Sequence, residues 1–155
     1  MSTTRRIMVH VDRGITGVSR YHRRLLQRCI FPCINLRLPC DYGIREVVRW
    51  LEPEQRGEGA LMFGLELLEI LTTTGRIQKC LCFSDALSLE QKGSKFFRRH
   101  FHNKSLYFWG SVAVDVVGDI CVPCLCQCNY YGLVLDWHKL KGNQWHRRNP
   151  ALCLR

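Results

Sequence analysis

The stretch Cys121-Val-Pro-Cys124-Leu-Cys126-Gln-Cys128 decides the fold expected for this chain and holds four of its ten cysteines. Cys121 and Cys124 have the spacing that lets two thiolates bind one tetrahedral metal ion. Cys124, Cys126 and Cys128 alternate, so on a strand their side chains would lie on one face. The stretch therefore predicts a thiol-bearing strand in the C-terminal part of the chain.

Further cysteines and histidines are candidates to complete a metal site. Cys80-Leu-Cys82 is a second thiol pair, and His100-Phe-His102 lies between the two cysteine groups. We predict a structural zinc ion held by Cys80, Cys82, Cys121 and Cys124. The reserve ligands are Cys126, Cys128, His100 and His102. The alternative is a set of buried thiols without metal, because cysteine is among the residue types most often buried.

Length and composition are those of one folded domain over residues 1–155, with 46% hydrophobic and 23% charged residues. The N-terminus lacks the apolar segment of a signal peptide, and no apolar run reaches the length of a membrane span. We therefore expect no membrane partner. We also expect reduced thiols or metal ligands rather than a disulfide framework, in the cytosol or nucleus.

Hydrophobic periodicity predicts a cysteine-rich α+β fold, a single domain with central helices and a C-terminal antiparallel β-meander. Apolar spacing predicts helices over residues 19–30, 41–51 and 60–71. Alternating and β-branched runs predict strands over residues 33–38, 76–83, 106–114, 120–127 and 133–137. Residues 138–155 are expected to form a basic tail.

The basic side chains suggest one class of partner. The formal net charge is +10, from 23 Lys and Arg against 13 Asp and Glu. Such an excess attracts polyanions or acidic proteins. Two basic clusters are interleaved with aromatic residues, as in proteins that bind RNA or single-stranded DNA. The candidate phosphate contacts are Lys95, Arg98, Arg99, Arg147 and Arg148.

The motifs of common enzymes are missing from the sequence. It has no phosphate-binding glycine loop, no nucleophile elbow and no HExxH motif. Its cysteines lie in apolar, strand-like runs rather than beside groups that would lower a thiol pKa. We therefore predict that the protein is not an enzyme and assign no catalytic residue.

Three groups of short motifs lie within about residues 36–135. The first is Leu38-Pro39-Cys40-x-x-Gly43 followed by Trp50 and Pro53. The second is the leucine-rich run 67–70 leading to Lys79-Cys80-Leu81-Cys82. The third runs from Ser105-Leu106-Tyr107 to Gly118-Asp-Ile-Cys-Val-Pro123. Together these motifs resemble the adenoviral early-region-4 thirty-four-kilodalton protein family.

The resemblance implies a function for the chain. Members of the family are nuclear adaptors that recruit host elongin and cullin subunits to form a ubiquitin ligase. They act with a second viral early protein and also favour export of late viral mRNA. By this resemblance we expect a viral early protein that redirects host protein degradation. The expected location is the host nucleus, with the cytoplasm as the alternative.

The resemblance also suggests residues that contact elongin. Family members use a short helix in which a leucine is followed four residues later by Cys or Ala. Leu25 and Cys29 have this spacing on the predicted basic helix, although Arg24 stands where the motif has Ser or Thr. We predict Leu25 and Cys29 as the partner-binding face. The alternative is that both are core residues.

Overall fold

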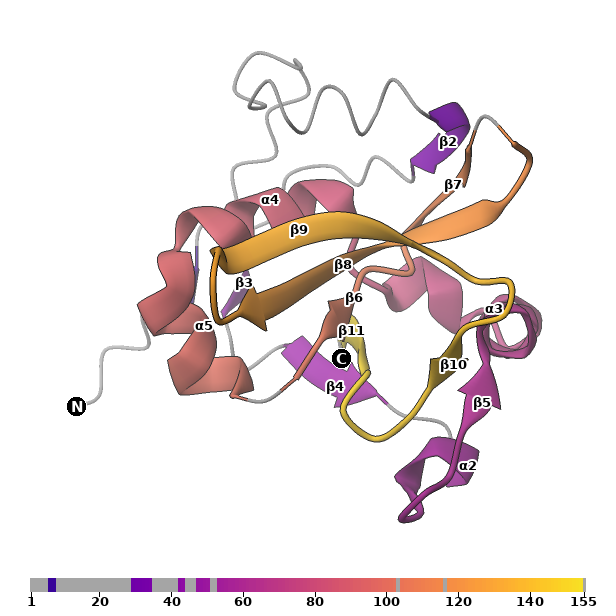
Figure 1. The fold of residues 1–155 in the computed structure, drawn as a ribbon, viewed down its shortest axis with the longest axis horizontal. Helices are drawn as coiled ribbons and strands as arrows, with labels where there is room; N and C mark the ends of the chain where they lie inside the picture. Colours follow the sequence, from indigo (N-terminus) through magenta and orange to yellow (C-terminus); the bar gives the residue numbers. More distant parts are fainter. Residues whose placement is uncertain are drawn as a thin grey trace.

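The computed structural model describes residues 6–7, 29–34, 42–43, 47–50, 53–102, 104–115 and 117–154. They form one mixed α+β body with helices before a mostly antiparallel C-terminal sheet (Figure 1), which confirms the predicted fold class. The described helices are α2 (Pro53–Arg56), α3 (Gly64–Thr73), α4 (Phe83–Gln91) and α5 (Gly93–Phe101), with a 3-10 turn η2 (Arg76–Lys79). The described strands are β1 (Arg6–Ile7), β2 (Cys29–Ile34), β3 (Tyr42–Gly43), β4 (Val47–Trp50), β5 (Met62–Phe63), β6 (Leu106–Tyr107), β7 (Ser111–Asp115), β8 (Ile120–Cys128), β9 (Gly132–Lys139), β10 (Gln144–Trp145) and β11 (Ala151–Leu154).

The main sheet is organised around β8, the strand that carries the cysteine stretch. β9 pairs with β8 along its whole length, from Lys139 opposite Cys121 to Gly132 opposite Cys128. On its other side it pairs first with β7 and then with β6. The strand order is β2-β7-β8-β6-β11-β4, and only the β6–β11 pairing is parallel among the described strands.

The sheet separates two hydrophobic clusters, because successive side chains of a strand point to opposite faces. On β8, Leu125 lies in the first cluster and Cys124 in the second. The first cluster includes buried side chains of α4 and α5, which lie along the β8–β9 hairpin in Figure 1. The second includes buried residues of α3 and the fully enclosed Trp109 and Trp145.

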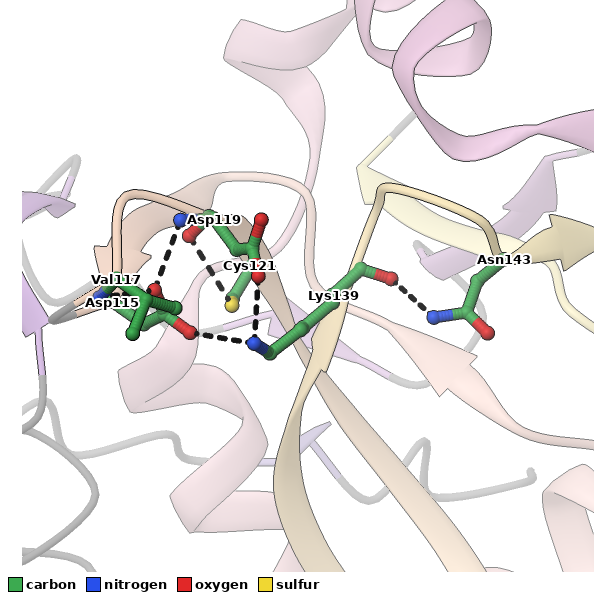
Figure 2. Close-up of polar contacts among 6 residues, drawn as sticks. All are labelled: Asp115, Val117, Asp119, Cys121, Lys139 and Asn143. Carbon is green, nitrogen blue, oxygen red and sulfur yellow. Dashed lines mark hydrogen bonds and ion pairs between the residues drawn. The ribbon is translucent and has the colours of Figure 1, made fainter.

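A polar cluster connects the β7–β8 turn to β9 (Figure 2). The Asp115 carboxylate accepts hydrogen bonds from the backbone N–H groups of Val117 at 3.0 Å and Asp119 at 2.9 Å. Lys139 on β9 lies 3.1 Å from the carboxylate of Asp115 and 2.7 Å from that of Asp119. Asn143 donates a hydrogen bond to the Lys139 carbonyl at 2.7 Å. These contacts set the relative position of the turn and the end of β9.

Several predicted elements are confirmed. The leucine spacing of residues 60–71 corresponds to α3, whose Leu67 and Leu71 are buried. The predicted strands 120–127 and 133–137 correspond to β8 and β9, whereas the predicted strand 106–114 is divided into β6 and β7, with residues 108–110 in neither strand. Within the described residues, no helix combines the length and apolarity that a membrane span requires.

The predicted helix over residues 41–51 is wrong where the structure describes it. Val47–Trp50 is strand β4, which pairs antiparallel with β11, with Val47 opposite Leu154 and Trp50 opposite Ala151. Two adjacent valines fit either a helical stripe or a strand, and β-branched residues favour the strand once a partner is present. The partner strand lies at the other end of the sequence.

The predicted strand over residues 76–83 is also wrong for most of its length. Residues 76–79 form η2, and only Cys80 makes a β-bridge, with Cys153. The chain turns into α4 because the Asp85 carboxylate accepts a hydrogen bond from the Cys82 N–H at 2.8 Å. This is one half of a capping box, which satisfies a backbone donor at a helix start.

Residues 138–154 are not a tail. Arg147 and Arg148, between β10 and β11, are exposed, but Trp145, Ala151, Leu152 and Cys153 are buried. β10 pairs with β5, while β11 lies between β4 and β6. β11 is apolar at every position, which explains its place between the two clusters: Leu152 enters the first cluster and Cys153 the second.

Candidate nucleic-acid interface

α5 brings three basic side chains to the surface. Its spacing buries Phe97 and Phe101 in the first cluster, four residues apart on one helix face. Lys95, Arg98 and Arg99 lie on the exposed side of the helix. Amphipathic packing of α5 therefore places its positive charge toward solvent.

The connection between β10 and β11 carries the second basic cluster, Arg147 and Arg148. The His146 N–H donates to the Asn149 side chain at 3.1 Å, and the Asn149 N–H donates to the His146 carbonyl at 2.8 Å. The Ser105 N–H donates to the Arg148 carbonyl at 2.9 Å. The Lys104 ammonium donates to the Arg147 carbonyl at 3.1 Å. These bonds hold the arginine-bearing loop against the segment that follows α5.

A cavity of about 630 Å³ is lined by residues of α5, of the β10–β11 connection and of the β8–β9 turn, and the turn lies beside α5 in Figure 1. Its basic lining residues are Arg98, His102, Lys104, His146 and Arg148. Among the described residues that line it, none is an aspartate or a glutamate. Thus one arginine from each of the two predicted basic clusters faces the same cavity.

Polar side chains and aromatic rings accompany these cations. Gln127, Asn129 and Asn149 line the cavity with amides that can donate and accept hydrogen bonds. Beside Asn129, in the β8–β9 turn, Tyr130 is 91% exposed and Tyr131 is 83% exposed. Exposed aromatic rings next to cations are the arrangement on which nucleic-acid bases stack.

Electrostatics at the cavity favour an anion. Burial, and then repulsion from Arg49, Arg147 and Arg148, lower the pKa of Lys104. Arg147 forms a 3.7 Å ion pair with Glu58, but both side chains are largely exposed, and exposed pairs contribute little. An anion bound in the cavity would relieve the repulsion among these cations.

The predicted zinc ligands lie in separate places. Cys80 lies 3.3 Å from Cys153, measured between sulfurs, in the second cluster. The Cys82 thiol lies 3.2 Å from the carboxylate of Asp85, at the start of α4. Cys121 donates to the carbonyl of Asp119 at 3.6 Å, near the β7–β8 turn. Cys124 lies with Cys80 in the second cluster, but among the described residues no three of the four preferred ligands come together.

The two thiols in the middle of β8 interact with each other. A hydrogen bond from Cys124 lowers the pKa of the half-buried Cys126 to about 7, despite its partial burial and the nearby Asp136. The hydrogen bond with Cys126, and then burial, raise the pKa of Cys124. Beside them the Tyr107 hydroxyl lies 3.0 Å from Nδ1 of His138. At neutral pH Cys126 is thus the more nucleophilic thiol of the pair.

The reserve histidine ligands have other neighbours. The His100 ring packs against Phe96 of the same helix in a tilted arrangement, with ring centroids 4.5 Å apart, and His102 lines the basic cavity together with Cys128. Within the described part of the chain, no three Cys, His, Asp or Glu side chains converge to hold one metal ion. The donor set therefore does not fit a tetrahedral zinc site there.

The structure describes only one of the two residues predicted to contact elongin. Leu25 lies outside the described residues. Cys29 is the first residue of strand β2, opposite Asp115 of β7, so the predicted helix does not extend to residue 30. Pairing with β7 explains this change. In the described sheet, β2 is a terminal strand, where a proline such as Pro32 is tolerated.

Sequence reasoning found part of the basic cavity and missed the rest. Arg98 and Arg148 were both predicted as phosphate contacts, whereas Lys104 and the two tyrosines of the β8–β9 turn were not. Adjacent Tyr130 and Tyr131 between Asn129 and Gly132 were the available signal. Side chains in a tight turn at the surface cannot reach the hydrophobic core, so aromatic rings there stay exposed.

Comparison of this chain with models of known protein families, with curated proteins and with solved structures finds no match. The adenoviral resemblance therefore remains a prediction based on short motifs, and the geometry described above is the basis for the proposed function.

Proposed function

We propose that this protein binds single-stranded nucleic acid, RNA or DNA, at the basic cavity beside α5. The observation that supports it is the convergence of Arg98 and Arg148 on one cavity without a described carboxylate among its lining residues. In the sequence, Arg98 precedes β8 and β9, and Arg148 follows them. Cations that gather where no acid neutralises them form a favourable site for phosphate.

The surroundings of the cavity favour a single strand. Its volume of about 630 Å³ falls within the size range of small-molecule sites and suits about one nucleotide. Tyr130 and Tyr131 are exposed in the turn between the lining residues Asn129 and Gly132 and provide faces on which unpaired bases stack. Bases in a duplex are already stacked and paired, so they offer no free face for stacking on these rings.

Fluorescence anisotropy with labelled single-stranded RNA and DNA of about ten nucleotides tests the proposal. We expect the affinity of the wild-type protein to fall steeply between roughly 50 and 200 mM salt. Arg98→Ala and Arg148→Ala should each weaken binding and reduce the salt slope by about 0.7 for each phosphate that is no longer neutralised. Lys141→Ala is the matched control, because Lys141 is exposed but does not line the cavity.

Stacking is tested separately from charge. Tyr130→Ala and Tyr131→Ala should each cost about 1–3 kcal/mol of binding free energy without changing the salt slope. If the cavity variants bind as tightly as the Lys141→Ala control, the site is wrong. If the wild-type protein prefers duplex to single strands, the proposed substrate is wrong.

The adaptor function implied by the adenoviral resemblance is a second proposal. The observation that favours it is a group of exposed apolar side chains near the start of α3: Leu61 (52% exposed), Phe63 (55%) and Leu65 (47%). Such side chains suit a protein partner better than a phosphate. Co-purification from nuclease-treated vertebrate cells should recover elongin and cullin subunits and a second viral early protein when it is co-expressed. Elongin recovery that survives Leu25→Ala would exclude the predicted contact helix.

A further inference from the structure

Two buried cysteines from distant parts of the sequence are in contact. Cys80 follows η2 and Cys153 lies in β11, 73 residues later, and their sulfur atoms are 3.3 Å apart. Both side chains are fully buried in the second hydrophobic cluster. This contact is separate from the basic cavity and takes no part in the proposed function.

The backbone geometry at this contact suits a disulfide. Cys80 and Cys153 are partners in an antiparallel β-bridge. The Leu81 N–H donates to the Leu152 carbonyl at 2.8 Å, while the Cys80 N–H donates to Ile77 instead. The two cysteines therefore form a non-hydrogen-bonded pair, in which Cα atoms lie about 4.5 Å apart and side chains are close. That separation falls within the range that disulfides require.

The strand segment that carries Cys80 is held firmly in place. The Gly110 N–H donates to the Leu81 carbonyl at 3.0 Å. A Cβ atom at position 110 would lie 2.5 Å from the Cys80 carbonyl oxygen, so only glycine permits this close approach. Because the bridge segment is fixed against the sheet, only the two thiol side chains have to rotate to form a bond.

We propose that Cys80 and Cys153 are an oxidative modification site that hydrogen peroxide converts to a disulfide. One thiolate attacks a peroxide oxygen, which yields a sulfenic acid and, after protonation of the leaving hydroxide, water. The second thiol then attacks the sulfenic sulfur, so that the S–S bond forms, the S–O bond breaks and a second water leaves. In total two thiols and one peroxide give one disulfide and two waters.

Oxidation at this site should stabilise the fold. The bond closes a loop of 73 residues and restricts the unfolded chain, which raises the melting temperature by roughly 10 °C in the chain-entropy description. Burial slows the reaction, since peroxide reaches the pair only when β11 opens locally. Cys126, with a pKa near neutrality and partial exposure, reacts faster but lies on a different strand.

The test uses the full chain, reduced and then incubated with hydrogen peroxide under native conditions. Remaining thiols are alkylated in denaturant, and the unreduced digest is analysed by mass spectrometry. We expect a cross-linked peptide pair containing Cys80 and Cys153, and an oxidant-dependent rise in melting temperature. Cys153→Ala should abolish the rise, whereas the matched control Cys128→Ala should retain it.

Three results would overturn the proposal. They are alkylation of both cysteines after the oxidant treatment, a link between Cys153 and a different cysteine, and a rise in melting temperature that persists in Cys153→Ala. Peptide mapping of the wild-type protein does not depend on whether a variant folds, so the proposal is testable even if Cys153→Ala is unstable.

Discussion

Gly64→Ala tests how closely α3 packs against the aromatic core. Gly64 is buried at the first position of α3. A Cβ atom there would lie 2.2 Å from Cζ3 and 2.7 Å from Cη2 of Trp145, and 3.1 Å from Cα of Leu140. The Trp145 ring is 2% exposed and packs against Tyr107 and Trp109, with centroid separations of 5.3 and 5.8 Å. The ring therefore has little room to move.

Two effects of opposite sign contribute to the expected change in stability. Alanine is favoured over glycine in a helix by up to about 1 kcal/mol. Forcing an extra methyl group into a packed core costs about 1–3 kcal/mol. The contacts at Gly64 are much shorter than van der Waals distance, so we expect the steric cost to dominate and Gly64→Ala to destabilise the protein by about 1–2 kcal/mol.

Urea unfolding followed by tryptophan fluorescence and circular dichroism measures this change. Trp145→Phe is the companion variant, because a smaller ring makes room for the new methyl group. In a double-mutant cycle we expect Gly64→Ala to cost about 1 kcal/mol less in the Trp145→Phe background. If Gly64→Ala is neutral or stabilising, or if the two changes are additive, the described packing is wrong.

Three further outcomes follow from the thiols and charges. Removing the hydrogen-bond donor with Cys124→Ala should raise the pKa of Cys126 and slow its alkylation by iodoacetamide at neutral pH by roughly tenfold for each unit of pKa. Hydrogen bonds from Asp119 and Lys139 lower the pKa of Asp115. The contribution of Asp115 to stability should therefore be complete above the ordinary carboxyl pKa and should be lost as the pH falls through its lower pKa in the folded protein. Acid unfolding of Asp115→Asn should lack this loss. Because no three described side chains converge on a metal at Cys121 or Cys124, we expect Cys121→Ser and Cys124→Ser to leave the metal content of the purified protein unchanged; loss of bound zinc in either variant would reinstate the predicted metal site.

The basic cavity shows which part of a binding site can be predicted from sequence. Basic clusters around Arg98 and Arg148 are visible as composition, and α5 exposes its cluster because Phe97 and Phe101 take the buried face. That the two clusters share one cavity follows from pairing of β10 and β11 with distant strands. The described residues do not support the predicted zinc site, because the spacing of cysteines within one segment does not show which segments meet in the fold.

The sequence by itself determined the elements whose patterns are local. The apolar stripe of α3 has a helical period, and the apolar runs of β8 and β9 are each bounded by turn residues, so that burial requires a helix in the first case and strands in the second. Tertiary structure decided the segments whose pattern fits two states. Val47–Trp50 became a strand only because β11 supplies its hydrogen bonds, and the apolar run 151–154 joined the core only because β4 and β6 flank it. Pairing between segments far apart in the chain carries no local signal, and it also placed Cys80 against Cys153.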